Sequence, residues 1–243
     1  MEILSVDTNA ELKRAKNIML WGFFAYVVCY LLSLPPIPII AHIASLGTLI
    51  AWIAVCYGLY CFSKLTHSPC FKYYMFSVLA IIAYYIILFA VLGYVYSTVL
   101  EYDTTQALQE ILPWLSLSVF VIIISLATLV TNLYLTYKLY YEMANLTGLK
   151  QFIFAFNLYV IATIGLILLS LVFGYLLYDF VQIYTDVLLD SDVANYFSEF
   201  IQGRVASFIM LVVLFCVMGI VYIVSYIFVA LGVWNIKEAQ VRH

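Results

Sequence analysis

The chain has 243 residues, of which 67% are hydrophobic and only 9% are charged. Ordinary soluble domains carry about 25% charged residues, so this composition excludes a typical soluble protein and predicts an integral membrane protein. The formal net charge of -3 and the lack of a basic face in the sequence also argue against nucleic-acid binding.

Residues 1–16 are polar and carry charges of both signs. Asn9 or Thr8 is a candidate N-cap for a short helix that leads into the first apolar run. We interpret residues 1–16 as a cytoplasmic segment that lies along the inner surface of the membrane.

Six apolar runs follow, and each is long enough for a helix that crosses a hydrocarbon core of about 30 Å. The clearest run, residues 152–178, contains no charged residue and no histidine. Pro35, Pro36 and Pro38 close the first run, which predicts a tight hairpin. The sequence therefore predicts an all-α integral membrane protein, a bundle of six transmembrane helices. The expected spans are residues 17–34, 39–62, 73–99, 113–137, 152–178 and 205–234, followed by a cytoplasmic tail at 235–243.

The distribution of basic residues predicts the orientation of the bundle. If the N-terminus is cytoplasmic, all Lys and Arg except Arg204 fall on the inner side, as the positive-inside rule requires. An even number of spans then places both termini in the cytoplasm. A general resemblance to small six-span bacterial membrane proteins implies the inner (plasma) membrane of a bacterium.

A shift of 81 residues aligns parts of the chain without a gap. Leu65-Thr66 then falls on Leu146-Thr147, and Gly93-Tyr94 falls on Gly174-Tyr175. We interpret the six spans as three helical hairpins that are weak parallel repeats, because a period of two spans keeps the direction across the membrane. The alternative is that the apolar composition alone produces these matches.

Polar residues inside the predicted spans are candidates for a binding pocket. Asn132, Asn157 and His42 are such residues, and none of the predicted spans has a charge near its middle. The alternative interpretation is that they hydrogen-bond to neighbouring helices, worth about 0.6–2 kcal/mol each. The lack of a central charge argues against an ion-coupled transporter.

The acidic segment after the fifth span is a candidate docking patch for a basic partner. Its acidic residues are Asp186, Asp190, Asp192 and Glu199. Apolar residues recur here at helical spacing, so we expect the fifth span to continue beyond the membrane as an amphipathic helix. A solvated surface is the alternative, since the spacing does not match an EF-hand.

No catalytic residue, metal site or cofactor is expected from the motifs. The five cysteines form no Cys-x-x-Cys pair, and no His-Glu-x-x-His or phosphate-binding glycine loop is present in the sequence. Many of the 22 tyrosines, including Tyr73, Tyr74 and Tyr140, sit near predicted span ends. We interpret these rings as anchors at the headgroup level.

Three hypotheses of function follow. The leading one is a non-enzymatic scaffold or accessory subunit of a membrane complex. Its partners would be membrane lipids and either another membrane protein or a second copy of the chain. The alternative is a permease or substrate-binding component for a small neutral or hydrophobic molecule. A weaker alternative is an enzyme that acts on lipid. A closed, dry bundle would favour the scaffold hypothesis. A polar cavity at mid-depth would favour the permease, and a groove beside Asp or Glu would favour the enzyme.

Overall fold

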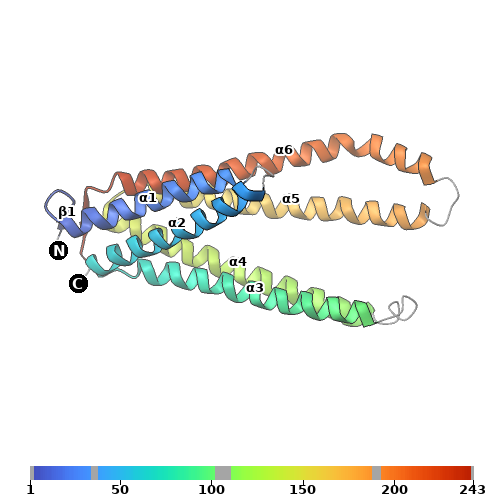
Figure 1. Ribbon diagram of the computed structural model, residues 1–243, viewed down its shortest axis with the longest axis horizontal. Coiled ribbons are helices and arrows are strands. Elements are labelled where there is room, and N and C mark those ends of the chain that lie inside the picture. Colours follow the sequence, from blue (N-terminus) through green and yellow to red (C-terminus); the bar gives the residue numbers. More distant parts are fainter. Residues whose placement is uncertain (1–2, 34–37, 102–110, 188–192, 242–243) are drawn as a thin grey trace.

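A computed structural model describes residues 3–33, 38–101, 111–187 and 193–241. Within these residues the chain forms six α-helices and two short β-strands (Figure 1). The elements are β1 (Ile3–Ser5), α1 (Ala10–Leu32), α2 (Pro38–Leu65), α3 (Cys70–Glu101), α4 (Ile111–Thr147), α5 (Gln151–Val187), α6 (Val193–Trp234) and β2 (Glu238–Gln240). Each of the six helices is long and apolar enough to cross a membrane, so the predicted all-α, six-helix membrane fold is confirmed.

The first helix begins at the predicted cap. The Leu12 backbone N–H donates to the Asn9 side-chain oxygen at 2.9 Å, which satisfies one of the free amides at the helix start. The helix then continues from Ala10 to Leu32 without a break. The expected short helix and the first span are therefore one element. Pro38 is the first residue of α2, a position that suits proline because its missing N–H would have no partner there.

The last two helices are much longer than a membrane crossing. α5 has 37 residues and α6 has 42, which correspond to about 55 and 63 Å at the helical rise. The fifth helix continues past the predicted span to Val187, while its amphipathic character and its place beyond the membrane stay predictions. The expected polar segment between the last two spans is largely helical, since α6 begins at Val193.

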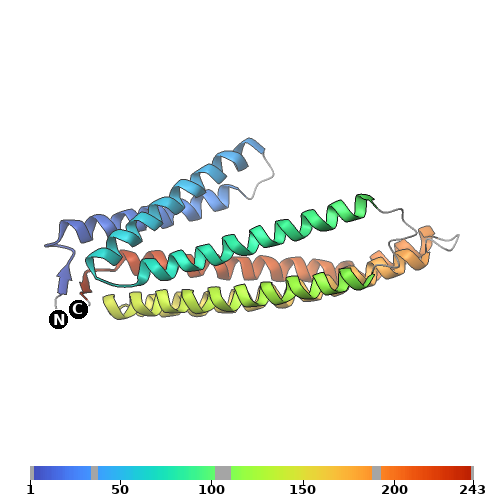
Figure 2. The same ribbon diagram turned by 90° about the horizontal axis from the view of Figure 1, so that it is seen from below.

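Consecutive helices pair as antiparallel hairpins, α1 with α2, α3 with α4 and α5 with α6 (Figures 1 and 2). α1 also packs against α6, and α4 packs against α5. The α1–α2 hairpin is shorter than the other two and tilts away from them toward its far end (Figure 2). The sequence relation among whole hairpins stays a prediction.

The turns after α2 and α4 share a local geometry. His67 and Gly148 both have a positive φ, of 51° and 68°, and they stand at the same offset of 81 residues. In each turn the preceding threonine, Thr66 or Thr147, donates its hydroxyl to the carbonyl four residues earlier, at 2.9 and 2.7 Å. A left-handed residue thus ends both helices, a common way to end a helix.

Replacing Gly148 with alanine should lower the free energy of unfolding by about 1–2 kcal/mol, because an L side chain is strained at this φ. The matched control is His67→Ala, which exchanges one side chain for another at the equivalent position and should change stability much less. Chemical denaturation in detergent micelles measures both variants. An equal loss in the two would contradict the strain argument.

The two ends of the chain are joined in a two-stranded antiparallel sheet, which we call the terminal clasp (β1 and β2). Leu4 pairs with Ala239 at its centre. The Val6 N–H donates to the Lys237 carbonyl at 2.8 Å, and the Lys16 ammonium donates to the Ile236 carbonyl at 2.8 Å. The clasp places both chain ends at one end of the bundle, as an even number of spans requires. Which side of the membrane this end occupies stays a prediction.

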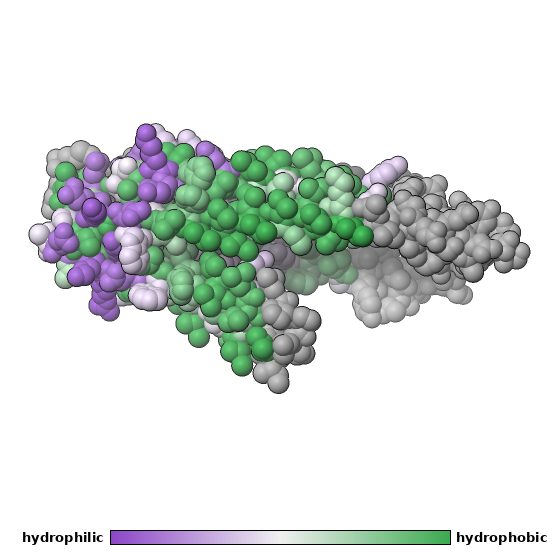
Figure 3. All heavy atoms as spheres, turned by 90° about the horizontal axis from the view of Figure 1, so that it is seen from above, coloured by the Kyte–Doolittle hydropathy of each residue, from purple (hydrophilic) through white to green (hydrophobic). Residues whose placement is uncertain are grey.

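The polar surface gathers at the clasp end, and the middle of the bundle is covered by apolar side chains (Figure 3). The alternating helix directions bring eight of the nine basic residues of the described chain toward this end: Lys13, Arg14, Lys16, Lys64, Lys72, Lys138, Lys150 and Lys237. The exception is Arg204, in the first part of α6. An apolar band next to a polar end is the surface expected of a protein that sits in lipid.

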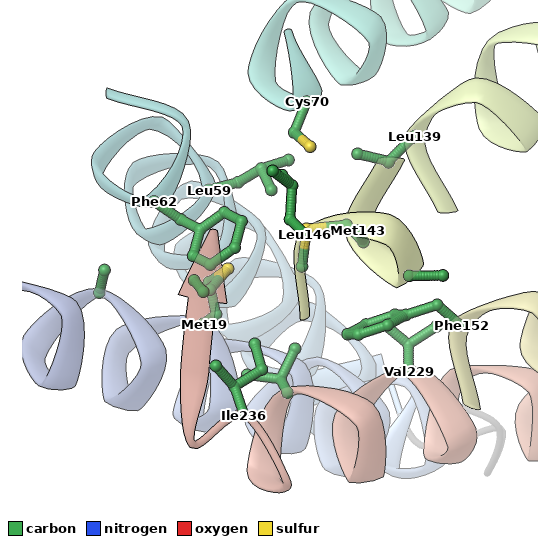
Figure 4. Close-up of a cluster of buried hydrophobic side chains, with 14 of the residues drawn as sticks. Met19, Leu59, Phe62, Cys70, Leu139, Met143, Leu146, Phe152, Val229 and Ile236 are labelled. Carbon is green, nitrogen blue, oxygen red and sulfur yellow. The ribbon is translucent and has the colours of Figure 1, made fainter. Parts of the chain in front are cut away.

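A cluster of buried hydrophobic side chains also lies toward the clasp end (Figure 4). Phe62, Phe152 and Ile236 are at most 1% exposed there, and they come from α2, from α5 and from the segment before β2. We call this group the terminal core: Leu12, Ala15, Met19, Leu59, Phe62, Cys70, Leu139, Met143, Ala144, Leu146, Phe152, Ala155, Val229, Val233, Ile236 and Ala239.

Candidate functional site: an aromatic cavity between the hairpins

A cavity of about 470 Å³ lies between the three hairpins and takes lining residues from all six helices. Tyrosine is the commonest lining residue, and none of the described residues that line the cavity is charged. Ligand sites typically measure about 300–1,000 Å³ and are mostly apolar with a few polar groups, which matches this cavity. Each helix contributes at least one lining residue, for example Tyr26 from α1, Trp52 from α2, Tyr85 from α3, Asn132 from α4, Tyr159 from α5 and Tyr222 from α6.

Asn132 is the centre of a hydrogen-bond network in the cavity wall. Its side chain is 8% exposed, and its amide nitrogen donates to the Ser77 hydroxyl at 2.8 Å. The Tyr159 hydroxyl donates to its amide oxygen at 2.9 Å. These bonds join α3, α4 and α5, and they satisfy a polar group that would be costly to bury alone.

A series of tyrosines continues the wall from α5 to α1. The rings of Tyr159 and Tyr222 are 5.7 Å apart, and those of Tyr222 and Tyr226 are 5.1 Å apart. The Tyr222 and Tyr226 hydroxyls lie 3.1 Å from each other. Tyr226 stacks on Tyr26 at 5.8 Å. Such pairs stabilise helix contacts beyond their buried area and keep hydroxyl groups inside an apolar bundle.

The terminal core lies next to the cavity. Leu59 and Leu139 line the cavity and also belong to the terminal core, where they pack with Phe62 and Met143. The cavity therefore borders directly on the terminal core.

The structure separates the three polar residues that the sequence proposed for a pocket. Asn132 lines the cavity. Asn157 and His42 are exposed, on α5 and α2, and neither is among the lining residues. Asn157 and Tyr159 are two positions apart, so a helix turns them toward nearly opposite faces, and only Tyr159 reaches the cavity.

Sequence reasoning missed most of the polar lining. Ser77, Thr136, Tyr159, Tyr222 and Tyr226 all line the cavity and were not proposed. The Tyr222/Tyr226 pair, four residues apart and well inside the last apolar run, was a usable signal, since such residues share a helix face. Tyr73, Tyr74 and Tyr140, which we interpreted from the sequence as anchors at the headgroup level, also line the cavity.

The proposed acidic docking patch falls entirely beyond the described side chains. Asp186 belongs to α5 and Glu199 to α6, while Asp190 and Asp192 lie outside the described residues. The docking patch stays a prediction.

The cavity can hold an uncharged molecule through ring stacking and a few hydrogen bonds. Among the described residues, no three His, Cys, Asp or Glu side chains come together as a metal site. Comparison with family models, with curated proteins and with solved structures found no match for this chain.

Proposed function

We propose that this polytopic membrane protein binds a small uncharged molecule between its helices, as the substrate-binding component of a permease would. The cavity of about 470 Å³, with aromatic and hydroxyl groups from six helices and no charged residue among its described lining, carries this proposal. A bundle that only supports another protein gains nothing from such a cavity, because unfilled space costs packing energy.

The other two hypotheses fit the cavity less well. A scaffold or accessory subunit is best served by a closed, dry bundle, so we propose this role only as the second candidate. A lipid-acting enzyme would need an acid or base beside its substrate, and the described lining residues include no Asp and no Glu.

The cavity-filling variant Val78→Trp tests the proposal. Val78 lines the cavity, whereas the next residue on α3, Leu79, is 52% exposed on the outer surface. We expect Val78→Trp to lower the amount of co-purified small molecule at least about tenfold, because the indole occupies the space the molecule needs. Solvent extraction and mass spectrometry of protein purified from native membranes measures the bound molecule.

Leu79→Trp is the matched control, since it adds the same side chain to the same helix. It should keep the wild-type amount of bound molecule. Equal binding by the two variants, or a wild-type protein that carries no molecule, would overturn the proposal.

A further inference from the structure

We infer that the ligand of this cavity is a planar, uncharged ring with carbonyl acceptors that is dissolved in the membrane, a molecule of the quinone class. The inference rests on the proposed function, since it names the class of molecule that the same cavity binds.

The first property, the lack of charge, follows from the lining. None of its described residues is ionised at neutral pH, because the polar members are hydroxyls, the Asn132 amide and the Trp52 indole. A charged ligand would lose its hydration without gaining a counter-charge, which is strongly unfavourable inside a membrane.

The second property, a planar ring, follows from the aromatic walls. Trp52 from α2, the stacked Tyr26 and Tyr226 pair and the Tyr159 and Tyr222 pair all face the same cavity. Aromatic side chains attract flat rings in offset or edge-to-face arrangements. A flat ring therefore gains more contact here than a branched aliphatic molecule of the same volume.

The third property, carbonyl groups that accept hydrogen bonds, follows from the N–H and O–H groups that the hydrogen-bond network around Asn132 and the tyrosines does not use. The Asn132 amide has two N–H donors, and Ser77 takes one of them. The hydroxyl groups of Tyr222 and Tyr226 form one hydrogen bond with each other, which uses one of their two O–H protons. The other proton remains as a donor for a ligand. Tyr159 links the two donors, because it bonds to Asn132 and contacts Tyr222. A ring with two carbonyl oxygens can accept from both.

The fourth property, solution in the membrane, follows from the helices that line the cavity. All six are long and apolar enough to cross a membrane. Apolar side chains cover the middle of the bundle (Figure 3), and a lipid-soluble quinone reaches such a surface by diffusion within the bilayer.

Trp52 provides a reporter inside the cavity. The variant that keeps only this tryptophan, with Trp21, Trp114 and Trp234 changed to Phe, is placed in phosphatidylcholine nanodiscs. It is titrated with a benzoquinone that carries a ten-carbon tail. We expect saturable quenching of the Trp52 fluorescence, since a bound quinone accepts energy and electrons from a nearby indole.

A second single-tryptophan variant, which keeps only Trp21, is the control for quinone that is merely dissolved in lipid. Trp21 is 67% exposed on the outer surface, so its quenching should rise linearly without saturation. Linear quenching of Trp52 with the same slope would overturn the inference.

Two changes to the donors test the carbonyl assignment. Asn132→Leu removes the amide, and the double variant Tyr222→Phe/Tyr226→Phe removes both hydroxyls while keeping both rings. Each should weaken quinone binding roughly two- to tenfold, the effect of one hydrogen bond. Unchanged binding in both variants would overturn the assignment, as would displacement of the quinone by a water-soluble sulfonated naphthoquinone.

The outcome for Val78→Trp separates this inference from the proposed function. If Val78→Trp releases the co-purified molecule while the quinone gives only linear quenching, the cavity binds another class of ligand. If Val78→Trp releases nothing, the proposed function itself fails.

Discussion

Replacing Gly58 with leucine is expected to separate α1 from α2 and to lower the free energy of unfolding by about 3 kcal/mol. A Cβ atom at Gly58 would lie 2.6 Å from Cγ and 2.8 Å from the backbone nitrogen of Met19. Because one of these atoms belongs to the backbone, a rotamer change cannot relieve the clash, and α1 itself has to move. Gly22 faces Val55 in the same way, at 2.8 Å, so two glycines bring these helices into close contact.

Gly219→Leu is the matched control for Gly58→Leu. Gly219 lies within α6, and a Cβ atom built there meets no other atom within 4 Å. This variant should be neutral, or more stable by up to about 1 kcal/mol because leucine favours a helix over glycine. The midpoint of thermal unfolding in detergent measures both variants. Equal destabilisation would show that the α1–α2 contact is not the reason for the loss.

Replacing Ala239 with lysine is expected to open the terminal clasp and to cost about 3 kcal/mol or more. Ala239 lies at the centre of β2, opposite Leu4, and its side chain is fully buried in the terminal core. A lysine there has to place an ammonium group among apolar side chains or break the strand pairing. Hydrogen exchange of the backbone amides in β1 and β2 reports the opening directly.

Glu238→Lys is the matched control for the clasp. It introduces the same side chain one position earlier, where the strand turns its side chain to solvent. The clasp amides should remain protected, and the unfolding midpoint should change little. Loss of protection in both variants would mean that added positive charge at this end, rather than burial at Ala239, opens the clasp.

The helices could be predicted because the features that form each of them lie within one short segment of the sequence. An uncharged run such as residues 152–178 can satisfy its backbone hydrogen bonds within itself, so lipid permits a helix there whatever the neighbours are. The cap at Asn9 and the helix start at Pro38 are also set by adjacent residues. The sequence predicted that the fifth helix continues past its apolar run, but it did not predict that the sixth helix begins as early as Val193. We attribute this early start to the pairing of α5 with α6, which extends helical order beyond the apolar runs.

The terminal clasp was not predicted, because a three-residue strand has no signal of its own. Ile3–Ser5 and Glu238–Gln240 lie at opposite ends of the sequence and become strands only by pairing with each other. Their pairing depends on six helices that bring both chain ends to one place.

The sequence by itself determined that the chain is a six-helix membrane protein, and it identified Asn132 as a residue worth noting. Only the tertiary structure decided that Asn132 faces a cavity while Asn157 faces outward. The reason is that lipid and the bundle interior are both apolar, so a transmembrane helix shows little difference in sequence between its two faces. The rotation of each helix, and with it the tyrosine wall of the cavity, is set by how the hairpins pack.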